Sequence, residues 1–247
     1  MTRIISVSLS KGGVGKTTTA TTLSHGLAIT KRRTLLIDTD TQNQCAKALG
    51  VDSEVGLADF MLDNVAFNDA VITVRDNLDL MVGGSRLAIL TNDIARETVR
   101  AEEVLKRKLM PHMSQYDYVI IDSSPSWDNL SVNLLFFADE LLLPCNLDQP
   151  SLDGLIDFIN RLDGFRDYRD INIQYVLPTA LDKRVAMTGH IKDQLYQAFG
   201  NKVCEPIPYN SSLGYAYAYG QTIFEYEPKS SSAIAYSKLV GRIIGDE

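Results

Sequence analysis

The sequence has few of the residues that hold metal clusters or cross-link secreted proteins. Its 247 residues include only three cysteines and three histidines. The cysteines form no C-x-x-C pair, which argues against a zinc or iron–sulfur site and suits a reducing compartment. The histidines also lack metal-ligand spacing. We therefore expect three unpaired, buried cysteines, namely Cys45, Cys145 and Cys204.

Long apolar runs are missing as well. No stretch reaches the ~18 apolar residues of a membrane span, and the start, MTRIISVSLS, turns polar too early for a signal peptide. These absences predict a cytoplasmic protein. Length and ordinary composition predict one large domain over residues 1–247. The net charge of −7 argues mildly against nucleic-acid binding unless a local basic patch exists.

The sequence does contain an alternation of strand-like and helical patterns. Near-continuous Val/Ile/Leu runs are typical of parallel strands buried on both faces. We predict an α/β fold in which a single doubly wound, mostly parallel sheet is flanked by helices. The expected strands are 3–10, 34–40, 78–84, 118–124, 140–146, 173–179 and 202–208. The expected helices are 17–29, 93–109, 152–165, 187–199 and 231–244.

A glycine-rich loop connects the first expected strand to the first expected helix. Its glycines let successive backbone N–H groups point at phosphate oxygens, and the helix start adds its positive dipole end. Lys16 would neutralise the outer phosphates, and the Thr17 hydroxyl would ligate Mg²⁺. A plain glycine-rich turn is the alternative, but the strand–loop–helix context disfavours it. The predicted nucleotide-binding residues are Lys11, Gly12, Gly13, Val14, Gly15, Lys16, Thr17 and Thr18.

Carboxylates follow two of the expected strands. Asp38 and Asp40 end the strand LLIDTD, and Asp122 ends YVIID. In a parallel sheet these ends meet at the nucleotide crevice. We expect Asp40 to position or activate the attacking water, and Asp38 and Asp122 to support Mg²⁺ through its water shell. The alternative is that these are polar strand ends with helix-capping carboxylates.

Five segments together resemble the ParA partition ATPases of the deviant-Walker family: KGGVGKTTTATTLSHGLA, LLIDTDTQNQ, YDYVIIDSSPS, VLPTALDKR and IFEYEPKSSSAIAYSKLV. The family loop reads K-G-G-x-G-K-[ST], whereas a standard phosphate loop has glycine where this chain has Ser10. The resemblance implies that Lys11 is catalytic together with Lys16 and Asp40. It would reach across a homodimer interface to the other subunit's ATP, as an arginine finger does in trans. Because the loop begins by residue 11, the resemblance implies the short form without an N-terminal DNA-binding domain.

The resemblance also implies a function. An ATP- and Mg²⁺-dependent dimer would bind nucleoid DNA non-specifically, and a ParB-like or cargo-adaptor protein would stimulate hydrolysis and release. Pro178, Thr179 and Pro208 would lie near adenine, although plain turn chemistry explains them equally well. The candidate DNA-phosphate contacts, each of which could equally be solvated surface, are Lys183, Arg184, Lys192, Lys202, Lys229, Lys238 and Arg242.

Other functions fit the loop less well. A MinD-like membrane ATPase should end in a basic amphipathic helix, but this chain ends in Asp246 and Glu247, which oppose anionic lipid, so we expect no stable membrane association. An iron-protein reductase would need flanked, dimer-paired cysteines, and a small-molecule ligase an acceptor pocket. A non-hydrolysing scaffold would not need Asp40. The run YAYAYG (215–220) and Trp127 remain open between partner contact and packing.

Overall fold

The fold is built on one seven-stranded sheet. The computed structural model describes residues 1–165 and 167–246. The strand order is β3-β4-β2-β5-β1-β6-β7, and every neighbouring pair is parallel except the antiparallel pair β3–β4. The predicted mostly parallel α/β sheet is therefore confirmed. The strands are β1 (Arg3–Val7), β2 (Thr34–Asp38), β3 (Ile72–Arg75), β4 (Leu78–Met81), β5 (Tyr118–Asp122), β6 (Glu140–Asn146) and β7 (Asn172–Thr179).

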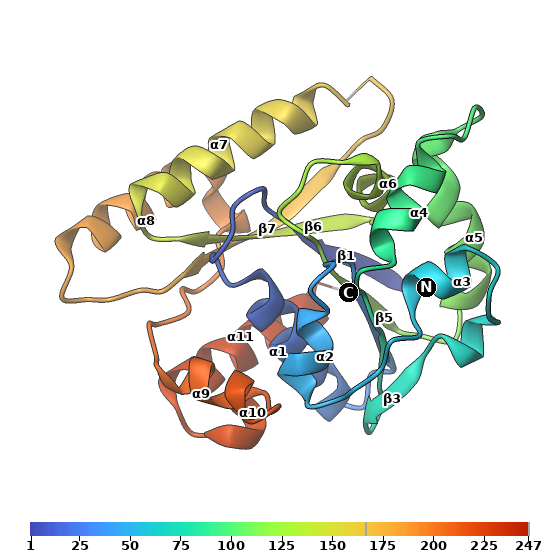
Figure 1. Cartoon of the computed structure of the whole chain (residues 1–247). Helices are drawn as coiled ribbons and strands as arrows, with labels where there is room; N and C mark the ends of the chain where they lie inside the picture. Colours follow the sequence, from blue (N-terminus) through green and yellow to red (C-terminus); the bar gives the residue numbers. More distant parts are fainter. Residues whose placement is uncertain (166, 247) are drawn as a thin grey trace.

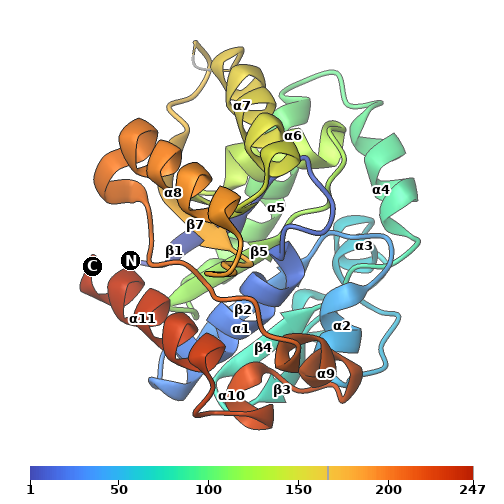
Figure 2. The same ribbon diagram turned by 90° about the vertical axis from the view of Figure 1, so that its left-hand side faces the viewer.

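Helices cover both faces of this sheet (Figure 1). On one side lie α1 (Lys16–Ile29), α2 (Gln44–Leu49), α9 (Ser212–Ala218), α10 (Ile223–Tyr226) and α11 (Ser231–Gly245). On the other lie α3 (Leu57–Met61), α4 (Leu87–Ile94), α5 (Val104–Met113), α6 (Asn129–Phe137), α7 (Gln149–Asp163) and α8 (Ala186–Phe199). Figure 2 shows α11 beside α1 and the two chain ends close together. Short 3₁₀ turns occupy Phe67–Asp69, Ala101–Glu103 and Gly200–Lys202.

The two-sided burial explains the strand sequences. In β2 all five residues are buried, and alternate side chains enter opposite cores. Leu36 packs in the core beneath α1 and α11, whereas Leu35 and Ile37 pack in the core beneath α3–α6. Helix α1 carries Leu23 and Leu27 between the sheet and α11, so it is buried on most sides. The phosphate loop that precedes α1 is thus anchored at both ends to the rigid centre of the fold.

Two predicted elements are wrong. Residues 202–208 form no regular strand but run extended, with isolated bridges from Val203 to Val176 and from Pro208 to Leu181. The predicted helix 93–109 is divided into α4 and α5, because the chain leaves the helical path after Ile94 and Arg100 adopts a left-handed φ of 49°. The sequence patterns also missed β3, α2, α3, α6, α9 and α10, most of which are too short to show a period.

The sequence analysis also made predictions about the cysteines and about membrane-spanning segments. All three cysteines are buried and free. Across residues 1–165 and 167–246, no helix is both long enough and apolar enough to cross a bilayer.

Candidate nucleotide and magnesium site

The phosphate loop leaves β1 and enters α1 with the backbone shape that a phosphate cradle needs. Gly13 and Gly15 have left-handed φ angles of 77° and 88°, which a side chain would strain. A Cβ added at Gly12 or Gly13 would meet no atom within 4 Å, so space lies open above the loop. Helix α1 begins at Lys16, directly after this turn. The loop therefore presents free backbone and a helix N-terminus to the same open space.

Lys16 lies under this loop and is held by it. Its side chain is buried, and its Nζ donates a hydrogen bond to the backbone oxygen of Lys11 at 2.7 Å. Burial lowers the pKa of the Lys16 ammonium, and the nearby Asp122 and Asp40 carboxylates oppose this shift. A bound polyphosphate would add negative charge and favour the charged ammonium.

Three side chains form a buried cluster next to Lys16. Asp38, Cys45 and Asp122 each offer one possible ligand atom, and these three atoms lie within 4.8 Å of one another. Asp38 accepts hydrogen bonds from the backbone N–H groups of Asp40 at 2.8 Å and Cys45 at 2.9 Å, so it orders the turn after β2. The Cys45 thiol lies 3.3 Å from one Asp122 oxygen. Cys45 is thus buried, as the sequence predicted, and it is also a polar contact of this cluster.

The electrostatics of the Asp38 and Asp122 carboxyl groups favour a bound cation. Burial raises the pKa of both the Asp38 and the Asp122 carboxyl groups, and their mutual proximity raises it at Asp122 further. The second Asp122 oxygen, Oδ1, is buried without a hydrogen-bond partner. A hydrated Mg²⁺ would supply that missing partner and would neutralise the two charges. The donor set, two carboxylates with the Thr17 hydroxyl nearby, suits a hard cation that keeps several waters.

Asp40 occupies a different position from Asp38. Strand β2 ends at Asp38, so Asp40 lies beyond the strand and on the wall of an open cavity of about 250 Å³. Its carboxylate is only partly buried and accepts a hydrogen bond from the Gln42 backbone N–H at 2.9 Å. The cavity is lined by Gly12, Gly13, Gly15, Lys16, Thr17, Thr18, Asp40, Gln44, Ser123 and Pro125. Its glycine wall, lysine and helix N-terminus fit a phosphate chain.

Two side chains brace the loop in a role that sequence reasoning did not predict. The Thr179 hydroxyl lies 3.0 Å from the Val14 carbonyl and 2.8 Å from the Asn146 amide oxygen, at the ends of β7 and β6. Asn146 in turn donates to the Gly13 carbonyl at 3.3 Å. No motif marks Asn146, but its place at the carboxyl end of a parallel strand could have pointed to it. Pro178, Thr179 and Pro208, predicted for the adenine side, lie outside the 250 Å³ cavity.

Lys11 lies at the mouth of the loop along α7. A Cβ built on Gly154 would lie 3.5 Å from the Lys11 Cβ and 3.9 Å from its Cγ and Cδ. The aliphatic part of Lys11 therefore rests on the α7 backbone where that helix has no side chain. Within this single chain, Lys11 lines no part of the phosphate cavity except through its backbone carbonyl on Lys16.

The basic residues predicted to contact DNA fall into two groups. Lys238 pairs with Glu205 at 2.7 Å, Arg184 pairs with Asp182 at 2.6 Å, and Arg242 donates to the Val203 and Asn201 carbonyls. These three are engaged within the chain. Lys183, Lys202 and Lys229 are exposed, and the Lys192 ammonium lies over the Tyr196 ring at 6.0 Å.

The aromatic residues that the sequence left open have different surroundings. Tyr215, Tyr217 and Tyr219 lie on or directly after α9 and are exposed. Trp127 instead packs edge-to-face on Phe158 of α7 at 5.4 Å, with the Arg161 guanidinium over its ring. Packing therefore accounts for Trp127, whereas the tyrosines form an open surface.

The parallel sheet, the phosphate loop at its carboxyl edge and the paired carboxylates define a P-loop nucleotide-binding protein. Comparison with known proteins narrows this class. Residues 2–175 match the protein family described as AAA domain. The chain is 32% identical to the sporulation initiation inhibitor protein Soj of Bacillus subtilis over 98% of each chain. It is 30% identical to the chromosome partitioning protein ParA of Caulobacter vibrioides, over 99% of this chain and 95% of that protein.

A solved structure shares the same fold and holds ligands. Cobyrinic acid a,c-diamide synthase from Mycobacterium smegmatis, with bound ADP and magnesium, is 26% identical with a TM-score of 0.83, covering 99% of this chain and 94% of that one. The chain therefore belongs to the ParA/MinD-type family of P-loop ATPases, as the resemblance predicted. Nucleotide and Mg²⁺ binding occur within this structural class.

Proposed function

We propose that this protein is an ATP-driven positioning switch that dimerises on ATP, binds DNA non-specifically and moves or segregates a cargo. The observation that carries the proposal is the site itself. One cavity joins a phosphate cradle, a buried lysine and the half-buried carboxylate of Asp40, and the second lysine, Lys11, lies at its mouth. A site for one subunit needs only Lys16, so Lys11 is available to a second subunit.

Each side chain has a defined task in the proposed reaction. The loop backbone and Lys16 bind the phosphates, and Asp38 orders the turn that carries Asp40. Asp40 orients the attacking water on the γ-phosphate. The Thr17 hydroxyl and the Asp38 and Asp122 carboxylates would hold Mg²⁺, which would supply charge neutralisation on the phosphate oxygens. Lys11 from the partner subunit stabilises the charge that develops during transfer.

Dimerisation would couple ATP binding and hydrolysis to the binding and release of DNA. The γ-phosphate supplies the contact that distinguishes the two states, because only a triphosphate reaches both lysines. Similarity to the chromosome partitioning protein ParA supports DNA as the surface that the dimer binds. A separate adaptor protein would stimulate hydrolysis. In this proposal the protein is associated with the nucleoid in the ATP state and released in the ADP state.

Analytical ultracentrifugation with Mg²⁺ and a non-hydrolysable ATP analogue tests the switch. The wild-type protein should sediment as a dimer, and Lys11→Ala should remain a monomer while it still binds the nucleotide. Asp40→Ala should dimerise with ATP and hydrolyse it at least about a hundredfold more slowly than wild type. A dimer of unchanged stability in Lys11→Ala would overturn the role of this lysine, and unchanged hydrolysis in Asp40→Ala would overturn the role of the carboxylate.

The structure gives no support to the membrane-associated alternative. Helix α11 does have an apolar face, but that face packs in the core beside α1, where Leu239, Val240 and Ile243 are buried. Membrane binding through the apolar face of α11 would require this helix to leave its place in the fold. Pelleting with anionic vesicles in the presence of ATP would separate the two functions, since the proposed switch should stay in the supernatant.

A further inference from the structure

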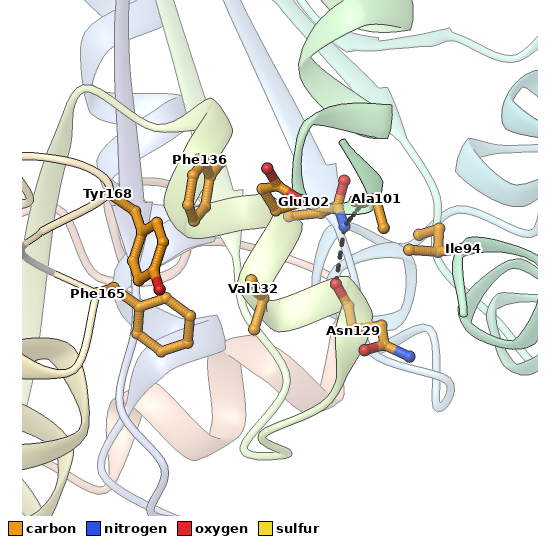
Figure 3. Close-up of a pocket in the computed structure, with 9 residues that line it drawn as sticks. Ile94, Ala101, Glu102, Asn129, Val132, Phe136, Phe165 and Tyr168 are labelled. Atoms are coloured by element: carbon orange, nitrogen blue, oxygen red, sulfur yellow. Dashed lines mark hydrogen bonds between the residues drawn. The ribbon is translucent and has the colours of Figure 1, made fainter. Parts of the chain in front are cut away.

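A metal ion needs several ligand atoms in one place, and the hollows of this molecule differ in how many they offer. The apolar groove in Figure 3 is lined mainly by aromatic and aliphatic side chains, and Glu102 is the one carboxylate among its described lining residues. By contrast, Asp38, Cys45 and Asp122 bring three possible ligand atoms within 4.8 Å of one another. No other such group of three carboxylate, thiol or imidazole side chains occurs in residues 1–165 and 167–246. The cluster is therefore the best-equipped place for a metal ion in the described chain.

The fold holds these three side chains in place. Asp38 and Asp122 are the last residues of the neighbouring parallel strands β2 and β5, and they lie opposite each other in the register. Cys45 lies in α2, and its backbone N–H donates to an Asp38 oxygen at 2.9 Å. All three residues are at most 1% exposed. The ligand positions are thus fixed by the sheet and its first connection, not by surface side chains.

The distances suit an ion shared between a thiolate and a carboxylate. Zn–S bonds of about 2.3 Å and Zn–O bonds of about 2.0 Å place the sulfur and oxygen ligands of a tetrahedral ion about 3.5 Å apart. The Cys45 Sγ already lies 3.3 Å from an Asp122 oxygen. The widest separation in the cluster, 4.8 Å at most, would have to close by roughly 1.3 Å (4.8 − 3.5).

The carboxylates point to a cation independently of the thiol. Asp122 Oδ1 is buried without a hydrogen-bond partner, a costly arrangement that a bound cation would relieve. The two Asp38 oxygens accept hydrogen bonds from the backbone N–H groups of Asp40 and Cys45. Hydrogen bonds of this kind orient the carboxylate ligands of metal ions.

The thiol determines which kind of ion the cluster prefers. Mg²⁺ takes oxygen ligands and keeps several waters, whereas a thiolate favours Zn²⁺ and similar softer cations. Binding would release the Cys45 proton to solvent, and the three anionic ligands would then face one dication and the nearby Lys16 ammonium, so that the formal charges cancel. The sequence did not indicate this site, because its ligands are 7 and 77 residues apart and not spaced as in C-x-x-C.

An ion can reach the cluster from the phosphate cavity. The cavity-lining residues Asp40, Gln44 and Ser123 each lie one or two positions along the chain from a member of the cluster. The cluster therefore lies directly behind the cavity wall.

We propose that Asp38, Cys45 and Asp122 bind a thiophilic divalent cation such as Zn²⁺, which takes both carboxylates directly and so displaces hydrated Mg²⁺. A water molecule would complete the tetrahedron. The displacement rests on the proposed function, because it assumes that Mg²⁺ uses the same two carboxylates. Binding of the thiophilic ion needs neither ATP nor a dimer, so the two proposals can fail separately.

Co²⁺, which occupies tetrahedral Zn²⁺ sites and absorbs light, tests the site in the whole nucleotide-free protein. Titration with a phosphine as the reductant should produce a thiolate-to-cobalt charge-transfer band in the near ultraviolet, and equimolar Zn²⁺ should abolish that band. Cys45→Ser retains the size and a hydroxyl but lacks the thiolate. It should lose the band and bind Zn²⁺ more than about a hundredfold more weakly, a larger loss than removal of an outer hydrogen-bond partner causes.

The matched control is the double variant Cys145→Ala/Cys204→Ala, which lacks the other two buried thiols and should keep the band. The zinc site is overturned if wild type binds Co²⁺ without the band, if wild type binds no Co²⁺, or if the band persists in Cys45→Ser. Circular dichroism of each variant checks its fold, and the two wild-type outcomes do not depend on any variant.

Mn²⁺ bound with ADP, followed by electron paramagnetic resonance, measures the displacement separately. One equivalent of Zn²⁺ should release Mn²⁺ from wild type and not from Cys45→Ser. If Zn²⁺ binds through Cys45 while Mn²⁺ stays bound, the zinc site stands, but the displacement and the proposed Mg²⁺ ligands are wrong. Failure of ATP-dependent dimerisation with intact Co²⁺ binding would count against the switch and not against the zinc site.

Discussion

The contact between Lys11 and Gly154 limits the size of the side chain that position 154 can carry. The Lys11 stem rests where α7 lacks a side chain, so a branched residue at that position would occupy the same space. We expect Gly154→Val to turn Lys11 away and to weaken the dimer formed with a non-hydrolysable ATP analogue by about tenfold or more. Sedimentation equilibrium measures the dimer, and nucleotide binding to the monomer should stay unchanged.

Gly154→Ala is the matched control for this prediction. Its Cβ would make ordinary contacts of 3.5 Å or more with Lys11, and alanine favours a helix interior by about 0.5–1 kcal/mol over glycine. This variant should dimerise as well as wild type and unfold at a slightly higher temperature. If the valine variant also dimerises normally, the contact with α7 does not position Lys11.

Elements that are far apart in sequence meet at the ends of α2 and α9. Gly50, which follows α2, and Gly220, which follows α9, both have left-handed φ angles, and a Cβ on Gly220 would lie 2.5 Å from the Gly50 Cα. Because the clash is with backbone, Gly220→Ala should lower the free energy of unfolding by about 1–3 kcal/mol. Chemical denaturation measures the loss. Gly214→Ala in α9, where a Cβ meets nothing within 4 Å, should cost no stability, and equal losses in both variants would refute the explanation.

The junction of α1 and α10 is expected to depend on pH. The His25 Nδ1 lies 2.6 Å from the Thr222 hydroxyl, and burial lowers the pKa of this imidazole below its ordinary 6.5. The folded state thus binds fewer protons than the unfolded state around that pH, so stability is present above pH 6.5 and falls as the pH drops through it. The slope attributable to one histidine is at most about 1.4 kcal/mol per pH unit.

Comparison of wild type with His25→Gln isolates this effect. The raised pKa values of Asp38 and Asp122 give the opposite slope in both proteins, and they cancel in the difference. Thermal unfolding between pH 5 and 8 should show a steeper loss toward acid in wild type than in the variant. Parallel curves for the two proteins would mean that His25 keeps its ordinary pKa.

The elements also show how far sequence reasoning reaches. The central strands were predictable because burial on both faces leaves unbroken Val/Ile/Leu runs, and the phosphate loop because its glycines need special φ angles. The extended segment 202–208 resembled those strands in composition, yet tertiary packing gives it only isolated bridges. Asn146 and Gly154 carry no local signal, and Thr179 was predicted for the adenine side and not for the loop, since the roles of all three arise from contacts across 133, 143 and 165 residues of the chain, respectively (146 − 13, 154 − 11 and 179 − 14).

At the scale of the whole molecule, the acidic net charge must be reconciled with the proposed DNA surface. Pairing of Lys238 with Glu205 and of Arg184 with Asp182 removes two of the candidate cations from that surface. Lys183, Lys192, Lys202 and Lys229 remain as exposed or half-buried charges. Because each phosphate contact contributes about −0.9 to the slope of log K against log salt, four lysines from each of two subunits would give a slope of about −7.

Fluorescence anisotropy of labelled duplex DNA, titrated with the ATP-bound dimer at several salt concentrations, measures this slope. Replacing Lys183, Lys192, Lys202 and Lys229 by alanine together should bring the slope near zero and abolish binding near physiological salt, whereas Lys238→Ala should change little because its charge is already paired with Glu205. Both variants must still form the ATP dimer for the comparison to hold. The reverse pattern, with Lys238 dominant, would mean that DNA breaks the pair with Glu205 and that the binding surface lies on α11. In the proposed function, the acidic chain would bind DNA only as a dimer, because the exposed lysines of two subunits together would supply an attraction that one subunit lacks.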